Sequence, residues 1–299
     1  MTNPKISELK EHLQMLEESQ DPDFKLLVKE EISRLTDEIL PDQKEDHSNA
    51  ILEIRAGTGG EEAELFGGEL ARMYLKFAEK MGWKIAINEK NESTIGGVKS
   101  FVATISGLDV YGTLKYEGGV HRVQRVPETE KKGRIHTSAA TVVVMPEIEE
   151  KQVEIRSEDL KIDVYRSGGH GGQSVNTTDS AVRITHKPTG IVVTCQDERS
   201  QLKNKDKAMG VLRAKLWQKE RDEKMASEKE LRLSMVKSGD RSDKIRTYNY
   251  PQDRITDHRI PKSWNNMQKI LDGDLNIVID ELKKVEKGQA IETILASAE

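Results

Sequence analysis

The sequence is poor in the residues that build metal and disulfide sites. It has one cysteine in 299 residues, so a disulfide framework and a thiolate metal cluster are both excluded. Cys195 lies in the apolar run GIVVTCQ and is expected to be a buried strand residue. The seven histidines show no HExxH motif and no paired ligand spacing, so we predict no metal site and no cofactor.

Long apolar runs are also missing. No stretch of 18 or more apolar residues occurs, and the first residues, MTNPKISELKEHLQ, lack the basic and then apolar layout of a signal peptide. We therefore expect a cytoplasmic protein with no membrane partner.

Charge is present but unevenly distributed. The formal net charge is -5, and residues 1–50 carry 13 Asp and Glu against 6 Lys and Arg. Residues 199–237 reverse this, with 12 Lys and Arg against 6 Asp and Glu. The basic residues of a helix often do no more than face solvent. The separation of acidic and basic segments is also compatible with a polyanionic partner.

Hydrophobic periodicity predicts a short helical hairpin at the start of the chain. Two runs of apolar residues recur at helical spacing: Ile6, Leu9, Leu13 and Leu16, then Val28, Ile32, Leu35 and Ile39. The polar stretch PDQKEDHSN then makes a plausible linker.

Short strands dominate the next hundred residues. AILEIRA alternates like a strand and leads through a glycine turn into a helix. Further strands are predicted at WKIAIN, SFVATIS, GTLKYE, VHRVQRV and TSAATVVVMP. This pattern favours an antiparallel sheet with a helix against one face.

A second module follows, with a hairpin around Pro188-Thr189-Gly190 and a long helix over residues 202–230. The chain is expected to end in another helix. The predicted fold is multidomain α+β, with a helical domain at 1–48, a sheet domain at 49–152, a small α+β domain at 153–233 and a C-terminal segment at 234–299 that packs on the sheet domain.

The stretch SGGHGGQSVNTTDS places four glycines before Gln173. Glycine allows a backbone to approach a partner closely. A dinucleotide-binding loop would open a helix, and a phosphate-binding loop would continue with GKS or GKT, so neither fits. A mobile loop without function stays open as an alternative.

Gln173 has no titratable proton and cannot act as a general base. Catalysis would have to come from placing a water molecule and from aiming a backbone N–H at developing oxyanion charge. Ester cleavage inside a pocket supplied by a partner is compatible with these groups.

The residues carry a family resemblance. GGQSVNTTDSAVRITHKPTGIVVTCQDERSQLKNKDKA resembles the GGQ domain of bacterial and organellar peptide chain release factors. RAGTGGEEAELF, GGVHRVQRVPETEKKGRIHTSAATVVVMPE and SGDRSDKIRTYNYPQDRITDHRI resemble other blocks of the same family in the same order. The match spans roughly residues 48–270.

The resemblance implies a stop-codon-reading loop in the sheet domain. VPETE is similar to the PxT tripeptide of the release factor 1 branch, which implies recognition of UAA and UAG. The residues implied in codon binding are Pro127, Glu128, Thr129, Gln124, His136, Thr137, Gly59 and Glu62. Of these, His136 would stack on a splayed base, and Gly59 and Glu62 would present polar groups to the first uridine.

The resemblance also implies the hydrolytic role of the glycine loop. Gly171, Gly172 and Gln173 would enter the peptidyl transferase centre of the ribosome, and Gln173 would be methylated on its side-chain nitrogen by a glutamine methyltransferase. The implied partners are ribosomal RNA, the mRNA stop codon, the P-site peptidyl-tRNA and a recycling GTPase release factor. The protein would then be a termination factor rather than a free-standing enzyme.

Two other functions stay open at this point. One is a codon-independent rescue factor for stalled ribosomes, although such proteins usually lack the sheet domain. The other is a ribosome-binding module without catalysis.

Overall fold

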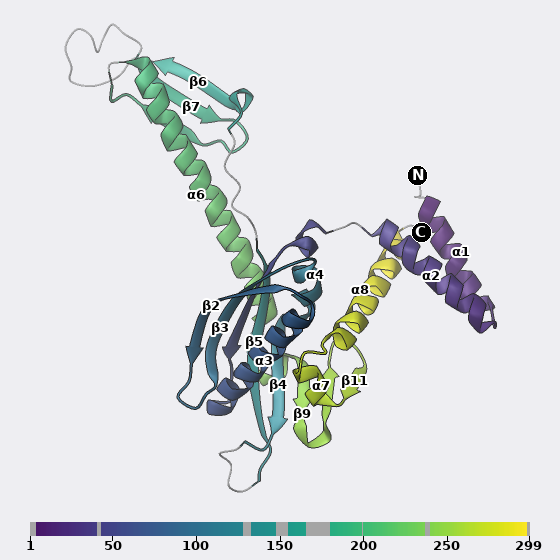
Figure 1. The fold of residues 1–299 in the computed structure, drawn as a ribbon. Helices are drawn as coiled ribbons and strands as arrows, with labels where there is room; N and C mark the ends of the chain where they lie inside the picture. The colour runs from purple at the N-terminus through teal and green to yellow at the C-terminus, as the bar shows by residue number, and fades with distance from the viewer. Residues whose placement is uncertain are drawn as a thin grey trace. The chain divides into compact units, whose positions relative to one another are not determined.

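The computed structural model describes residues 4–40, 43–127, 133–147, 155–165, 180–198, 200–236 and 240–297. Its contacts divide the chain into two compact units, one formed by Met1–Ile148 with Arg232–Glu299 and the other by Glu149–Leu231. Both units combine helices with β-sheet (Figure 1). The α+β class expected from the sequence is confirmed.

The predicted helical hairpin is present at the start of the chain. Helix α1 (Pro4–Glu18) packs against α2 (Pro22–Ile39), and the stripe residues Leu9, Val28 and Leu35 are buried. Helix α2 begins after Asp21, whose side chain accepts a hydrogen bond from the Asp23 N–H at 3.0 Å. This cap satisfies a backbone donor that the first helical turn would otherwise leave unpaired.

The first unit is built on an eight-stranded sheet with the order β11-β10-β9-β4-β5-β1-β3-β2. Neighbouring strands are antiparallel except for β4 and β9, which are parallel. The strands are β1 (Ala50–Ala56), β2 (Lys84–Glu92), β3 (Val98–Ser106), β4 (Gly119–Arg125), β5 (His136–Pro146), β9 (Lys244–Asn249), β10 (Arg254–Asp257) and β11 (Lys262–Asn265).

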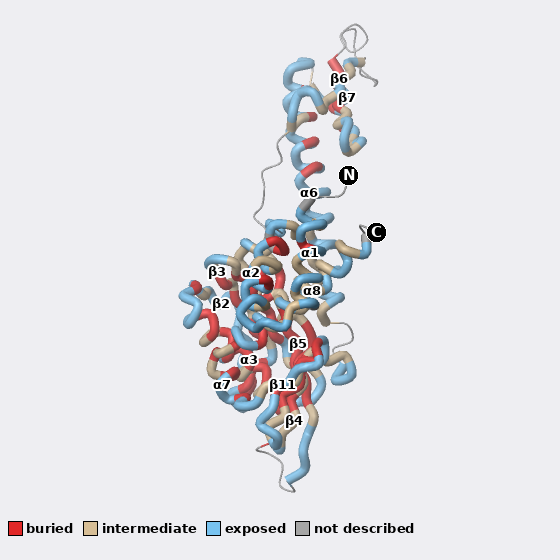
Figure 2. Tube along the Cα trace, turned by 90° about the vertical axis from the view of Figure 1, so that its right-hand side faces the viewer, coloured by how far each residue is buried: buried red, intermediate tan, exposed pale blue. Residues whose placement is uncertain are grey.

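Helix α3 (Glu61–Lys80) lies across one face of this sheet (Figure 1). Its buried stripe includes Phe66, Leu70 and Phe77, which join the strand residues Leu52 and Val142 in one core. Figure 2 shows buried residues concentrated in α3 and in the strands of this unit. Their burial removes a large apolar area from water and fixes the helix on the sheet.

One predicted strand, GTLKYE, is wrong. These residues form the end of α4 (Val110–Leu114) and the 3₁₀ turn η2 (Lys115–Glu117). Val110 and Leu114 are four residues apart and both buried, so a helical turn places them on one face toward the core. Lys115 then binds Asp46 of η1 (Lys44–His47) at 2.9 Å, a contact that stabilises the turn.

The C-terminal segment extends the sheet, which its sequence pattern did not reveal. After η4 (Arg241–Asp243), β9 pairs with β4, and β10 and β11 follow it outward. The remaining elements are η5 (Tyr250–Gln252), α7 (Met267–Leu271) and α8 (Asn276–Ser297). Buried residues of α7 and α8, including Ile270 and Ile279, belong to the same core as the buried residues of α3.

The second unit is a three-stranded antiparallel sheet packed against a helix. After η3 (Ser157–Asp159), the strands are β6 (Leu160–Tyr165), β7 (Ala181–His186) and β8 (Val192–Cys195), in that order. The predicted hairpin turn joins β7 to β8, with Gly190 at a φ of 69°. Ala208, Leu212 and Leu216 of α6 (Gln201–Val236) are buried in the same core as the strand residues. Cys195 is buried there, as expected from its apolar run.

Candidate functional site

The end of the β4–β5 pair brings together four polar residues from two chain segments. Gln124 is the register partner of Thr137, and Arg125 is the register partner of His136. Direct partners in an antiparallel pair share a face of the sheet and lie close enough to interact. Because side chains alternate along a strand, Gln124 and Thr137 occupy one face, and Arg125 and His136 occupy the other. His136 is exposed, while Gln124 and Thr137 are partly exposed.

A glycine turn before α3 packs against the same end of β5. The Gly57 N–H donates to the Ala139 carbonyl and the Ala139 N–H donates to the Thr58 carbonyl, both at 2.9 Å. Gly59 has a φ of 144°, and a Cβ at this position would lie 2.3 Å from the Ser138 Oγ. Only glycine allows this close approach, so Gly59 packs directly against Ser138 of β5.

Glu62 is the second residue of α3 and faces the sheet rather than solvent. It is 6% exposed, and its carboxylate accepts a hydrogen bond from the Arg125 Nε at 2.5 Å. The family resemblance implies a contact between Glu62 and the first uridine, yet in this structure the Glu62 carboxylate is bound by Arg125 of β4. Arg125 itself was not singled out, although it directly precedes VPETE.

Arg125 has further partners that the sequence did not indicate. Its Nη1 donates to Glu69 Oε1 at 2.6 Å, and its guanidinium lies over the Tyr250 ring, 5.0 Å from the ring centroid. The Tyr250 hydroxyl in turn donates to Glu69 Oε2 at 2.6 Å. Burial alone would lower the pKa of Arg125, but the hydrogen bond that Arg125 donates to Glu69, together with the Glu69 charge, outweighs burial and raises that pKa.

Strand β9 supplies another neighbour of Gln124. Asn249 is its register partner on the side opposite Thr137, with the Asn249 Nδ2 3.5 Å from Gln124 Oε1. Asn249 also caps η5 by accepting from the Gln252 N–H at 3.2 Å. The C-terminal segment therefore reaches the candidate site, a link between residues 125 positions apart in the chain.

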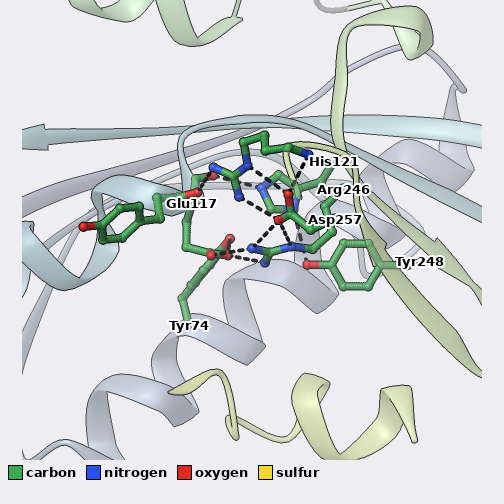
Figure 3. Close-up of polar contacts among 8 residues, drawn as sticks. Tyr74, Glu117, His121, Arg246, Tyr248 and Asp257 are labelled. Carbon is green, nitrogen blue, oxygen red and sulfur yellow. Dashed lines mark hydrogen bonds and ion pairs between the residues drawn. The ribbon is translucent and has the colours of Figure 1, made fainter. Parts of the chain in front are cut away.

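The opposite end of β4 is anchored by a buried charge cluster (Figure 3). Arg246 donates to both carboxylate oxygens of Glu117, at 2.6 and 2.7 Å, and its Nε donates to Asp257 at 3.1 Å. The Tyr74 hydroxyl donates to Glu117 at 2.9 Å. The cluster joins η2, α3, β9 and β10, and its charged groups are fully buried or nearly so.

The pKa values of this cluster follow from burial and pairing. Burial would raise the pKa of Glu117, but the charge of Arg246 outweighs it and holds that pKa below its usual value. The pKa of Asp257 falls to about 2 because the hydrogen bond from Arg259 and the charge of Arg246 outweigh burial. Burial and the Arg246 charge lower the pKa of His121 to about 4. Arg246, Glu117 and Asp257 are at most 1% exposed, so their ion pairs join η2, β9 and β10 inside the unit.

The predicted catalytic residues Gly171, Gly172 and Gln173 lie outside the described residues, as do Glu128 and Thr129. The strands on either side of the glycine segment are described. Tyr165 and Ala181 are register partners, so the segment starts and ends at neighbouring points of one sheet. Pro127, the first residue of the tripeptide, is buried.

Asn204 binds the residue at which the glycine segment ends. Its Nδ2 donates to the Ser180 and Glu198 carbonyls, both at 2.7 Å, and its Oδ1 accepts from the Glu198 N–H at 2.9 Å. The side chain is fully buried. Asn204 thereby ties the start of β7 to the first turn of α6.

The described residues offer neither a cluster of metal ligands nor a membrane-spanning helix. No group of three or more His, Cys, Asp and Glu side chains there is arranged to hold a metal ion. None of the helices in the described ranges has the length and apolar character needed to cross a membrane.

Comparison with known proteins places the chain in a family. The PCRF domain model matches residues 2–142, and the RF-1 domain model matches residues 147–259. Peptide chain release factor 1 of Carboxydothermus hydrogenoformans is 50% identical over 304 residues, covering 98% of this chain and 85% of that protein. Peptide chain release factor 1 of Thermoanaerobacter pseudethanolicus is 59% identical over 244 residues, covering 82% of this chain and 68% of that protein.

A solved structure is also similar. RF2 of Thermus thermophilus matches with a TM-score of 0.52 and 36% identity, covering 92% of this chain and 81% of that one. The chain therefore belongs to the peptide chain release factor family, and its relatives named above are of the release factor 1 type.

Proposed function

We propose that the end of the β4–β5 pair and the segment carrying Gln173 are the two working sites of a translation termination factor. As a member of its family, the protein recognises the stop codons UAA and UAG and triggers hydrolysis of peptidyl-tRNA on the ribosome. The observation that best supports the first site is the convergence of the glycine turn, the start of α3 and the cross-strand pair Gln124–Thr137.

In the codon site, Pro127, Glu128 and Thr129 form the tripeptide that selects UAA and UAG. Gln124 and Thr137 supply an amide and a hydroxyl for the edge of the third base, since each can both donate and accept hydrogen bonds. His136 stacks on an unstacked base, a common mode of recognising single-stranded RNA. Gly59 offers backbone groups to the first base, because its close packing on Ser138 brings the turn next to Thr137.

The geometry suggests a different function for Glu62 from the direct codon contact expected from the sequence. Its carboxylate is buried and bound to Arg125, so the side chain already has a partner within the protein. We assign the Glu62 side chain to support of the hairpin and its backbone to the codon.

In the hydrolytic site, Gly171 and Gly172 bring the backbone of Gln173 to the ester of peptidyl-tRNA. The Gln173 N–H stabilises charge that develops in the transition state, and the side chain admits water while excluding larger nucleophiles. Methylation of the Gln173 amide nitrogen by a glutamine methyltransferase would add an apolar group there.

The partners follow from these roles. The ribosome supplies rRNA, the stop codon and the P-site peptidyl-tRNA, and a recycling GTPase release factor would act after hydrolysis. Release takes place where ribosomes translate, in the cytoplasm. The four parts at 1–48, 49–152, 153–233 and 234–299 would separate codon reading from hydrolysis, with the last part supporting the codon site.

A release assay tests this proposal directly. Purified ribosomes carrying formylmethionyl-tRNA in the P site are programmed with UAA, UAG, UGA or a sense codon, and the formylmethionine set free by the purified protein is measured. Release at UAA and UAG alone is expected. Codon-blind release would instead indicate a rescue factor, and no release at any codon would indicate a ribosome-binding module without catalysis.

A further inference from the structure

The Arg125 side chain joins three segments that are distant in the sequence. It is the last residue of β4, it binds two carboxylates of α3, and it lies against Tyr250 of η5. Its side chain is 15% exposed, so these contacts are shielded from water on most sides. Salt screens partly buried ion pairs of this kind less than it screens exposed ion pairs.

The two carboxylates are placed to receive one guanidinium. Glu62 and Glu69 are seven residues apart on α3, which places them on one face of the helix, two turns from each other. The planar guanidinium reaches both with different nitrogens, Nε and Nη1, while its face stays on the tyrosine ring. A lysine ammonium has one nitrogen and no planar face, so it cannot reproduce this geometry.

Arg125 lies next to several of the residues proposed to bind the codon. Gln124 precedes it on the opposite face of the strand, Pro127 is two residues further on, and His136 is its register partner. A rotation or shift of Arg125 therefore moves each of these residues. Without the guanidinium, the Glu62 and Glu69 carboxylates would face each other across a site with little solvent, and their repulsion would favour such a shift.

From this geometry we infer that Arg125 is a positioning residue for stop-codon recognition. It holds the end of the β4–β5 pair on α3, in the register that presents Gln124, His136 and Thr137 to the codon. This inference rests on the proposed function and extends it to a residue that does not itself contact RNA. The hydrolytic step, which depends on Gln173 in the other unit, is independent of it.

The test separates codon binding from hydrolysis. Release is measured at UAA and UAG over a range of protein concentrations for the wild type, Arg125→Gln and Arg125→Lys. The half-saturating concentration of Arg125→Gln should rise roughly tenfold or more, the change that corresponds to a loss of about 1.4 kcal/mol in binding. The release rate at saturation should stay within about twofold of the wild type. Arg125→Lys should recover only part of the loss, because it restores charge but not the forked geometry.

Lys76→Gln is the matched control. Lys76 binds Asp272 at 2.7 Å and so also joins α3 to the C-terminal segment, but it lies far along the helix from the β4–β5 end. This variant should release peptide like the wild type. If Arg125→Gln is indistinguishable from Lys76→Gln, or loses only saturated rate, the inference is overturned while codon-specific release by the wild type still upholds the proposed function.

A second variant covers the case in which Arg125→Gln does not fold. Glu69→Gln keeps Arg125 and Glu62 in place and removes one charge from the cluster. It should raise the half-saturating concentration severalfold, again without loss of saturated rate. An unchanged half-saturating concentration in Glu69→Gln, with Arg125→Gln unfolded as judged by circular dichroism, would also overturn the inference.

Discussion

Gln124 of β4 and Thr137 of β5 are direct cross-strand partners, and Asn249 of β9 lies on the other side of Gln124. Residues from three strands thus meet on one face at one end of the sheet. Their amide and hydroxyl groups all donate and accept hydrogen bonds, which suits the reading of base edges.

Thr137→Val tests whether this face reads the codon. The substitution removes a hydroxyl and keeps the branched shape, so the half-saturating concentration for release at UAA and UAG should rise roughly fivefold to tenfold, as expected for the loss of one hydrogen bond worth about 1 kcal/mol. The rate at saturation should not change. Thr141→Val is the control, since Thr141 lies on the same face of β5, four residues along the strand from Thr137, but its hydroxyl donates to the Arg55 carbonyl. Equal effects from both variants would show that Thr137 has no special role.

Gln173→Pro tests the backbone N–H proposed to act in hydrolysis. Proline has no N–H, so release should be lost while binding to stop-codon-programmed ribosomes stays close to that of the wild type. Gln173→Ala keeps the N–H and should retain measurable release. Binding is followed by co-sedimentation with ribosomes, and release by the formylmethionine assay. Full release by the proline variant would rule out the N–H as the donor.

His121 predicts a pH dependence of the stability of the first unit. Its ring lies between the Glu117 carbonyl and the Tyr248 hydroxyl, and burial lowers its pKa from 6.5 to about 4. A lowered histidine pKa means that the unfolded chain binds the proton more readily than the folded one. His121 therefore does not change the free energy of unfolding above pH 6.5. Its protonation lowers that free energy as the pH drops from 6.5 to 4, by on the order of 3 kcal/mol.

Urea unfolding between pH 7 and pH 4.5 measures this effect. A Trp217→Phe background leaves Trp83 and Trp264, both in the first unit, as the fluorescent probes. His121→Gln does not titrate, so it should flatten the pH dependence over this range. If the free energy of unfolding falls with pH equally steeply in His121→Gln and in its parent, groups other than His121 cause the acid sensitivity. Asp257, whose pKa is lowered to about 2, would add a further loss only below pH 4.

Asn204 predicts a local effect in the second unit. Asn204→Asp replaces two donated hydrogen bonds to carbonyls with repulsion between a carboxylate and carbonyl oxygens, which should cost about 3 kcal/mol in the stability of this unit. The measurement is hydrogen exchange of β7 and β8 amides in the whole chain. Lys207→Gln, one turn along α6, is the control and should leave exchange unchanged, because Lys207 is exposed. Equal protection in both variants would contradict the role given to Asn204.

Hydrophobic periodicity predicted the helices whose apolar stripe is the face that the folded structure buries. The apolar stripes of α1 and α2 and the turn at Gly190 could be predicted because each reflects the spacing of a helix or the backbone demand of a tight turn. GTLKYE was misread because its alternation resembles a strand, while the contacts of Val110, Leu114 and Lys115 favour a helical turn.

The sequence by itself determined the family and marked the candidate site residues, because the GGQ and PxT blocks are local and contiguous. Only the tertiary structure decided which residues support them. The pairing of β9 with β4, the carboxylates that hold Arg125 and the buried Arg246–Glu117 pair each join residues more than 50 positions apart. Contacts of that kind depend on how the chain folds back on itself, and no local pattern of residue types specifies them.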